Sequence, residues 1–227
     1  MRPLHACSRA ALLAAVLWCV GAQADSGSTA LDRFLDGLTS LHTAFAQTVT
    51  DSKGKQVESG AGTLLVQRPG KFRWDYTPRD ADAAVAPPKS DSPRGQLLVA
   101  DGKNLWFYDR ELAQVSVKPV NAALSATPMM LLSGSSTQLR DAFEITAGAN
   151  HDGLDWVHVK PKSDEADFNG ADLGFARDQL SRMTIHDRLG QTVELDFSHG
   201  ERNVRVDASE LQFKAPSGVD VIGTPQS

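Results

Sequence analysis

Arg68 is the residue whose type and position suggest the most specific chemistry in this chain. It follows a segment in which strand alternation places Leu64, Val66 and Arg68 on one face. If that face lines an apolar interior, the guanidinium points inward, and because it cannot be neutralised it needs hydrogen-bond acceptors there. The alternative is an arginine at the rim of the interior that extends its charged end into water. Strand alternation alone leaves both interpretations open.

Residues that could carry catalysis are scattered along the sequence. The histidines form no HExxH or paired-histidine metal spacing, and no GxSxG, GxGxxG or phosphate-binding loop occurs. We interpret Ser133–Ser136 as a turn that ends a helix, and the acidic residues between Asp164 and Asp167 as the tip of a hairpin. The sequence therefore predicts no enzyme, no cofactor and no metal site.

Aromatic and methionine side chains recur on single strand faces and suggest an apolar binding surface. Phe72, Trp74 and Tyr76 share one face, and Trp106 and Tyr108 share a face of a later segment. Ordinary core packing is the alternative for each stripe. Two consecutive methionines add soft contact surface that suits a flexible apolar ligand. We predict that an apolar cavity is lined by Leu64, Val66, Phe72, Trp74, Trp106, Tyr108, Met129, Met130 and Leu131.

Strands dominate the elements that would position these residues. Leu31–Leu41 carries apolar residues at helical spacing, and Thr29–Asp32 has the form of a capping box, so we predict one N-terminal helix. After His42 the apolar period changes to two residues, and turn sequences containing glycine separate the alternating segments. We predict strands at about 42–51, 56–68, 71–77, 96–101, 104–109, 112–118, 143–149, 154–161, 171–177, 180–187, 191–199 and 203–213.

Twelve short strands in up-and-down order cannot stay flat, because their twist accumulates. We therefore predict a mainly β fold in which the antiparallel sheet curls into a barrel or half-barrel. Pro119–Ala142 lacks alternation and predicts short apolar helices at Asn121–Leu124 and Thr127–Leu132, with Thr127 as a cap and Pro128 at the first helical position. Laid over the open mouth of a half-barrel, these helices would enclose a hydrophobic space.

The N-terminal residues 1–24 have the features of a cleaved signal peptide. They combine a basic start, an apolar stretch too short to span a bilayer comfortably and a small-x-small site at Ala22–Ala24. Residues 25–227 are then expected to form a single domain without cysteine, because Cys7 and Cys19 lie in the removed segment. Cys19 follows Trp18 rather than a small residue, which argues against a lipid anchor.

The charge of the remaining chain limits its partners. Removing residues 1–24 leaves 21 basic and 28 acidic residues, a formal charge of −7. This balance argues against a nucleic-acid partner and against electrostatic adsorption to anionic lipid. The segment Arg79–Gly95 is rich in Pro, Ala, Asp and Ser, and we predict that it is a solvated, mobile loop.

Several segments together resemble the LolA family of outer-membrane lipoprotein carriers. The resemblance covers nearly all of residues 25–227 and implies an incomplete antiparallel barrel with a helical lid over an apolar cavity. It also implies a monomeric periplasmic chaperone that receives lipoproteins from the inner-membrane LolCDE transporter and delivers them to the outer-membrane receptor LolB. The matching segments are Phe45–Asp51, Gln67–Pro69, Phe72–Trp74, Asp101–Tyr108, Thr127–Leu132 and Phe213–Val221.

The same resemblance assigns a role to Arg68. The functional arginine of the family falls on this position, where it would hold the lid shut through hydrogen bonds to the lid backbone. Such bonds to spare carbonyls at helix ends are weak enough to be reversible. One departure from the family is the segment Arg79–Gly95, which looks longer than the usual connection. Near the cavity mouth, a longer loop would change how partners dock.

Other functions of the same fold remain alternatives. The chain could carry another amphiphile such as a glycolipid, or be a receptor like LolB, although that receptor should carry a lipid-attachment cysteine that Cys19 does not provide. From a different class, it could be a sensor or adaptor with a filled core that binds protein partners. Co-purified lipid would favour a carrier, and consistently empty preparations would favour the adaptor.

Overall fold

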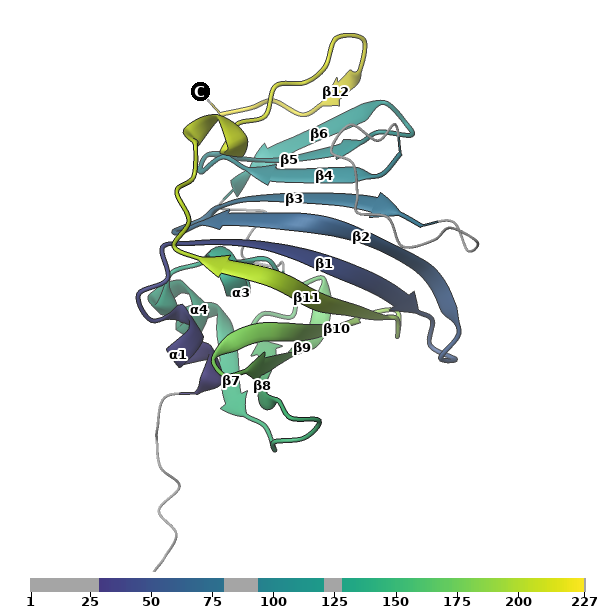
Figure 1. Ribbon diagram of the computed structural model, residues 1–227. Helices are drawn as coiled ribbons and strands as arrows, with labels where there is room; N and C mark the ends of the chain where they lie inside the picture. The colour runs from purple at the N-terminus through teal and green to yellow at the C-terminus, as the bar shows by residue number, and fades with distance from the viewer. Residues whose placement is uncertain (1–28, 80–93, 121–127, 227) are drawn as a thin grey trace, which may run out of the picture.

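The computed structural model describes residues 29–79, 94–120 and 128–226. The signal peptide predicted at residues 1–24, the helix predicted at 121–124 and most of the segment 79–95 lie outside these ranges. Within them, twelve strands form one curved sheet, with short helices on its concave side (Figure 1). No helix in this part of the chain is long and apolar enough to cross a membrane. The prediction of an incomplete, mainly antiparallel half-barrel with helices over it is confirmed.

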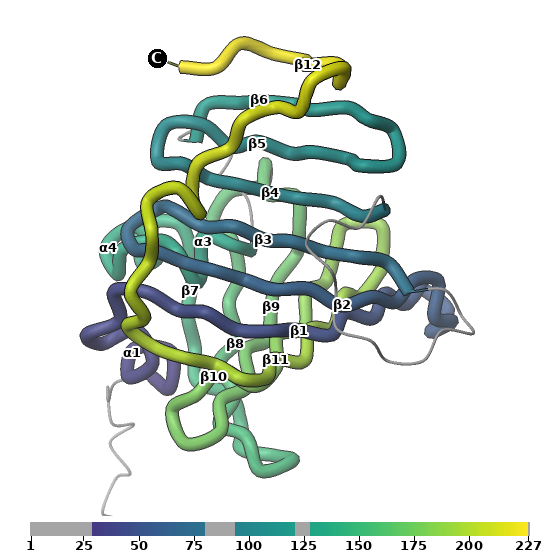
Figure 2. The backbone as a smooth tube through the Cα atoms, turned by 45° about the horizontal axis from the view of Figure 1, so that its top comes forward, coloured from purple at the N-terminus to yellow at the C-terminus, as the bar shows by residue number. Residues whose placement is uncertain are grey.

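Two antiparallel meanders build the sheet and join through β1 and β11. The strand order is β12-β6-β5-β4-β3-β2-β1-β11-β10-β9-β8-β7, so β12 and β7 are its two edges. The second meander lies behind the first, with the interior between them (Figure 2). The strands are β1 Ser40–Thr50, β2 Gln56–Gln67, β3 Lys71–Pro78, β4 Gln96–Ala100, β5 Asn104–Asp109, β6 Gln114–Pro119, β7 Phe143–Ala147, β8 Asp155–Pro161, β9 Phe168–Ala176, β10 Gln179–Asp187, β11 Thr192–Arg202 and β12 Asp220–Ile222.

The N-terminal helix α1 is shorter than its apolar stripe predicts. It spans Ala30–Leu35, with the predicted capping box between Thr29 and Asp32. The chain then turns at Gly37, which has a positive φ of 61°, a conformation that glycine adopts at little cost. Leu38 and Leu41 are buried with the helix residues but lie in the connection and in β1. The apolar residues at helical spacing therefore extend beyond the end of the helix, because Leu38 and Leu41 are buried from non-helical backbone.

Helices α3 (Met130–Ser133) and α4 (Ser136–Ala142) follow β6 and cover the interior. The predicted start at Pro128 is wrong, because α3 begins at Met130 and has no side-chain cap. The proposed cap Thr127 lies outside the described residues. The turn predicted at Ser133–Ser136 is confirmed: Gly134 ends α3, and the Ser135 side chain caps α4.

The strand predicted at 203–213 is also wrong. This segment has no ladder partner; it contains the 3-10 helix η1 (Ala208–Leu211), capped by Asp207. It crosses the first meander on the face opposite the helices (Figure 2) and buries Leu211 there. The last strand is instead β12, which pairs in parallel with β6. An alternating apolar pattern thus marks a half-buried extended segment, whether or not it joins the sheet.

Candidate functional site

Arg68 lies directly after β2 and connects two helix ends. Its Nε and Nη2 atoms donate to the carbonyl oxygen of Gly134 at 3.1 and 2.7 Å. Its Nη1 atom donates to the carbonyl oxygens of Leu35 at 3.0 Å and Leu38 at 3.4 Å. Gly134 caps the end of α3, and Leu35 is the last residue of α1. The half-buried guanidinium is therefore bonded to protein carbonyls, which favours the inward-facing interpretation over the rim arginine.

The acceptors of Arg68 are available because of where they lie. The last carbonyl groups of a helix have no partner within that helix, so they can accept hydrogen bonds from a cation. Burial lowers the pKa of Arg68, but a guanidinium remains protonated in proteins. Backbone bonds hold the same loop, since Arg68 N–H donates to Thr39 at 2.8 Å and Gly70 N–H donates to Ser133 at 2.7 Å. Both α1 and α3 are thus anchored at one end of β2.

The end of β11 holds the connection between α1 and β1 in place. Asn203 Oδ1 accepts a hydrogen bond from Thr39 N–H at 2.8 Å, and its Nδ2 donates to Gly37 at 3.1 Å. Arg202 Nη2 donates to the Asp36 carbonyl at 2.9 Å. These bonds position the carbonyls that Arg68 uses. Sequence reasoning missed both residues, because nothing in their local sequence indicates contact with the N-terminal connection.

Asn203 allows a test of this support. Its φ of 57° is in the left-handed region, where a β-carbon costs about 1–2 kcal/mol and asparagine is tolerated. We expect Asn203→Gly to lower the free energy of unfolding by about 1–2 kcal/mol through lost side-chain bonds, and Asn203→Ala to lower it further through backbone strain. Denaturant unfolding measures both changes. Equal stability of the glycine variant and the wild type would show that the side-chain bonds contribute nothing.

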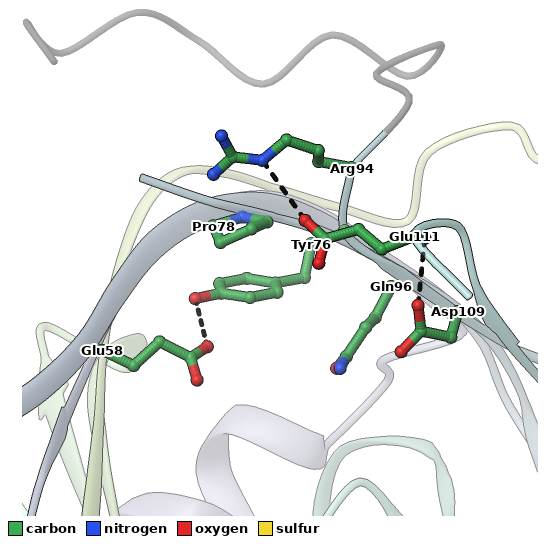
Figure 3. A pocket seen from close by; sticks show the side chains of 8 residues that line it. Glu58, Tyr76, Pro78, Arg94, Gln96, Asp109 and Glu111 are labelled. Atoms are coloured by element: carbon green, nitrogen blue, oxygen red, sulfur yellow. Dashed lines mark hydrogen bonds and ion pairs between the residues drawn. The ribbon is translucent and has the colours of Figure 1, made fainter. Parts of the chain in front are cut away.

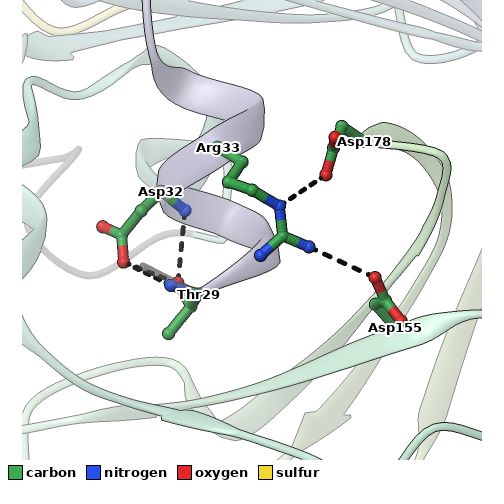
Figure 4. Close-up of polar contacts among 5 residues, drawn as sticks. All are labelled: Thr29, Asp32, Arg33, Asp155 and Asp178. Carbon is green, nitrogen blue, oxygen red and sulfur yellow. Dashed lines mark hydrogen bonds and ion pairs between the residues drawn. The ribbon is translucent and has the colours of Figure 1, made fainter. Parts of the chain in front are cut away.

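Ion pairs connect α1 to α4 and to the second meander. Arg140 Nη2 lies 2.5 Å from Asp32 Oδ1. Figure 4 shows Arg33 on the other side of α1, with Nε 2.7 Å from Asp178 Oδ1 and Nη2 3.2 Å from Asp155 Oδ2. Burial would raise the pKa of Asp32, but hydrogen bonds from Thr29 and the Arg140 charge outweigh it and hold this pKa below its ordinary value. Helix α1 is thus held on two sides.

The lowered pKa of Asp32 predicts a pH dependence. A carboxyl group whose pKa is lower in the folded state stabilises the fold above its unfolded pKa, near 4, and loses that contribution as the pH falls through the folded value. Asp32→Asn keeps a side-chain acceptor for Thr29 but removes the charge. We expect the variant to be less stable than the wild type at pH 7, and the difference to shrink as the pH falls below the unfolded pKa and through the lower, folded one. Unfolding curves recorded from pH 7 into the acid range measure this, and a pH-independent difference would contradict it.

Most residues predicted to line a cavity meet between the sheet and the helices. Leu64 faces Trp74 and Val66 faces Phe72 across β2 and β3. The Trp74 ring stacks on Phe45, with ring centroids 3.8 Å apart. Phe45 was absent from the predicted set, although Gly62 beside it leaves the room that its ring occupies. The members of the predicted set in this apolar cluster are Leu64, Val66, Phe72, Trp74, Met129, Met130 and Leu131.

Trp106 and Tyr108 are corrections to that set. Trp106 is opposite Val99 and Val117 in the ladder, on the face away from the helices. Both aromatic rings pack on Phe213 of the C-terminal segment, with centroid distances of 5.4 and 6.1 Å. The prediction failed because Leu105–Tyr108 is apolar on both faces, so alternation could not tell which face was inward. The C-terminal segment supplies the cover for the outer face.

The sequence of this chain matches a known protein family, and this match decides its family membership. The model of the outer membrane lipoprotein carrier protein LolA family matches residues 36–214. The chain belongs to the LolA family. This membership confirms the prediction of a protein that is not an enzyme. Among the described residues, no group of three or more His, Cys, Asp or Glu side chains is placed to hold a metal ion.

Relatives of known name support the LolA assignment. An outer-membrane lipoprotein carrier protein of Methylobacillus flagellatus is 35% identical over 92% of this chain and 93% of its own. A protein of the same name from Chromobacterium violaceum is 36% identical over 98% of each chain. A solved structure of an uncharacterized conserved protein from Thermus thermophilus has a TM-score of 0.51 at 13% identity, covering 85% of this chain and 96% of that one. The last likeness concerns the fold alone.

A polar pocket lies at the end of the sheet opposite Arg68. It has a volume of about 310 Å³ and lies around Tyr76, whose hydroxyl donates to Glu58 Oε1 at 2.6 Å (Figure 3). Burial, together with this hydrogen bond, raises the pKa of Tyr76. Arg94 Nε is 3.3 Å from Glu111 Oε1 across the same pocket. Its charged lining makes it unsuitable for an acyl chain.

Proposed function

We propose that this protein is a periplasmic carrier that binds the acyl chains of lipoproteins released from the inner membrane by the LolCDE transporter and delivers them to the receptor LolB. Family membership and the names of its relatives support lipoprotein carriage. The observation that carries the proposal is the bridge from Arg68 to the ends of α1 and α3, above an apolar interior. We call these two helices together with α4 the lid.

In this proposal the hydrogen bonds of Arg68 keep the empty lid closed. Each bond joins a cation to a neutral backbone carbonyl and contributes at most about 3 kcal/mol. Entering acyl chains would separate the helices from β2 and break these bonds. Because the acceptors are carbonyls at helix ends and not a paired carboxylate, the bonds can break and form again without leaving an opposite charge buried.

The magnitudes explain why a carrier needs such bonds. One long acyl chain gains on the order of 10 kcal/mol on leaving water, at about 0.8 kcal/mol for each methylene group. A carrier that captured this whole free energy would hold its cargo too tightly to release it. Breaking the Arg68 bonds and separating the lid from the apolar cluster lowers the net affinity, and closing the lid again favours release.

Loading and transport test the proposal directly. The purified protein is incubated with inner-membrane vesicles that contain the transporter, a lipoprotein and ATP. We expect the lipoprotein to appear in the soluble fraction in a one-to-one complex with this protein, consistent with a monomeric carrier. An unrelated periplasmic protein serves as the control. Lipoprotein that stays in the membrane fraction would contradict the proposal, whereas a bound glycolipid would support carriage of another amphiphile.

In the same proposal, the predicted signal peptide directs the protein to the periplasm. Residues 1–24 would direct export and be removed, so the mature chain would begin at Asp25. We expect N-terminal sequencing of the protein from a periplasmic extract to start at this residue. A chain that keeps Met1 and fractionates with the cytoplasm would contradict the assignment.

A further inference from the structure

Among the described residues, the sheet ends at the three-residue strand β12 on one side and at the five-residue strand β7 on the other. At one edge, β12 pairs with β6, and Gln226 exchanges hydrogen bonds of 3.1 and 2.7 Å with the Asn104 side chain. At the other edge is β7, and no strand of the described residues pairs beyond it (Figure 1). An open strand edge presents backbone donors and acceptors that another strand can use.

The direction of the peptide groups in β7 follows from the bonds at its two ends. Lys162 N–H donates to the carbonyl of Ala142 at 2.9 Å, and Gly148 N–H donates to the carbonyl of Trp156 at 2.8 Å. In an antiparallel pair, residues alternate between those whose peptide groups face the partner and those whose groups face away. The even-numbered residues from 142 to 148 therefore face β8, and the odd-numbered residues face the open edge.

This edge borders the apolar interior beside the lid. Phe143 N–H points away from β8 and donates to the Leu139 carbonyl of α4, so the helix uses that donor. Ile145 and Ala147 come next, with N–H and C=O groups directed outward. Phe143 itself is buried in the apolar cluster, and Ile145 packs against it. The outward N–H and C=O groups of Ile145 and Ala147 thus follow directly after the residue that α4 uses, at the border of the apolar cluster.

We propose that the open edge of β7 binds, as an added strand, the extended polypeptide that follows the lipid-bearing end of a cargo lipoprotein. This inference rests on the proposed function, which places the acyl chains in the interior. Because Phe143 and Ile145 of β7 border that interior, the inference adds that the polypeptide starts beside this strand. Backbone pairing is independent of side-chain identity. It therefore suits a carrier whose cargoes share a lipid and a polypeptide backbone but not a sequence.

The outer face beside β7 fits the side chains of such a strand. Alternate residues of an added strand would point toward a pocket of about 450 Å³ on that face. The pocket contains charges of both signs, with His158 and His186 both bonded to Asp172 and with Glu144 and Lys160 nearby. A surface of this kind accepts varied polar side chains without selecting one of them.

Three synthetic probes separate pairing at β7 from lipid binding. The first is a lipopeptide with a diacylated N-terminal cysteine and a short extended tail. The second is the same lipopeptide with backbone N-methyl groups on alternate tail residues. The third is the diacylated cysteine amide, which has no tail. We expect N-methylation to weaken binding about tenfold, as the loss of one or two backbone hydrogen bonds would. Ala147→Pro should bind the first probe as weakly as the wild type binds the second.

Ala147→Pro is suited to this test because its N–H faces the open edge, where proline is tolerated in a strand. Ala147→Val keeps the N–H and should behave as the wild type does. If N-methylation has no effect while the cysteine amide binds normally, the tail does not pair with β7, although lipid carriage stands. If no lipidated probe binds, the proposed function fails and this inference with it. If the wild type is a dimer that Ala147→Pro dissociates, the edge joins two copies, which also overturns the inference.

Discussion

An Arg68→Leu variant is expected to load lipoprotein at the wild-type level but to transfer it to the receptor at least about tenfold more slowly. The substitution deletes all guanidinium donors, including those that bond to Gly134 and Leu35, while leucine keeps apolar bulk next to the interior. The closed, empty state then loses the bonds that favour it, whereas the open, loaded state loses nothing. The net affinity for cargo rises by the free energy of those bonds, and release slows accordingly.

A two-step assay measures this expectation. Loading is followed as lipoprotein released from inner-membrane vesicles into the soluble fraction, and transfer as its movement to the soluble domain of the receptor. Arg68→Lys is the matched control: it keeps the charge, but its single ammonium cannot reproduce the planar fork that reaches both helix ends. We expect it to transfer at an intermediate rate. Wild-type rates for both steps in Arg68→Leu would leave Arg68 as a structural residue only.

The need of Arg68 for acceptors could be predicted from its strand phase, but the acceptors themselves could not. They are backbone carbonyls, which every residue carries, and which of them meet the guanidinium depends on how α1 and α3 approach β2. The contribution of Asn203 was hidden for the same reason, because it holds Thr39 from a position far away in the chain. Sequence patterns describe local structure, whereas these contacts arise from tertiary packing.

The clarity of the local pattern decided which elements were predicted correctly. In β11, Val193, Leu195 and Phe197 alternate with acidic and hydroxyl residues, so its strand phase could be read from the sequence. In β5 both faces are apolar, and Trp106 was assigned to the wrong one. The short strand β12 was missed because its three residues are exposed and carry no apolar alternation. It pairs with β6, which is far away in the sequence, and no hairpin turn connects the two strands.

A charge at Phe72 is expected to abolish lipoprotein capture. Phe72 is 1% exposed and lies opposite Val66 in the apolar cluster under the lid. Phe72→Glu would place a carboxylate where an acyl chain must go. Burying an unpaired carboxyl group costs several kcal/mol, either as the desolvated ion or through the uptake of a proton that neutralises it. Capture should fall at least about tenfold, because one such penalty exceeds the 1.4 kcal/mol that corresponds to a tenfold change.

Stability and capture must be separated in this experiment, since Phe72→Glu also removes a core ring and should lower the free energy of unfolding by about 3–5 kcal/mol. Phe72→Leu is the control that keeps an apolar side chain, and it should capture lipoprotein while losing about 1 kcal/mol of stability. Trp74→Glu introduces the same charge at a partly buried site and should fold more readily. If Trp74→Glu and the folded fraction of Phe72→Glu both capture lipoprotein as well as Phe72→Leu, the acyl chains do not occupy the space between β2, β3 and the lid.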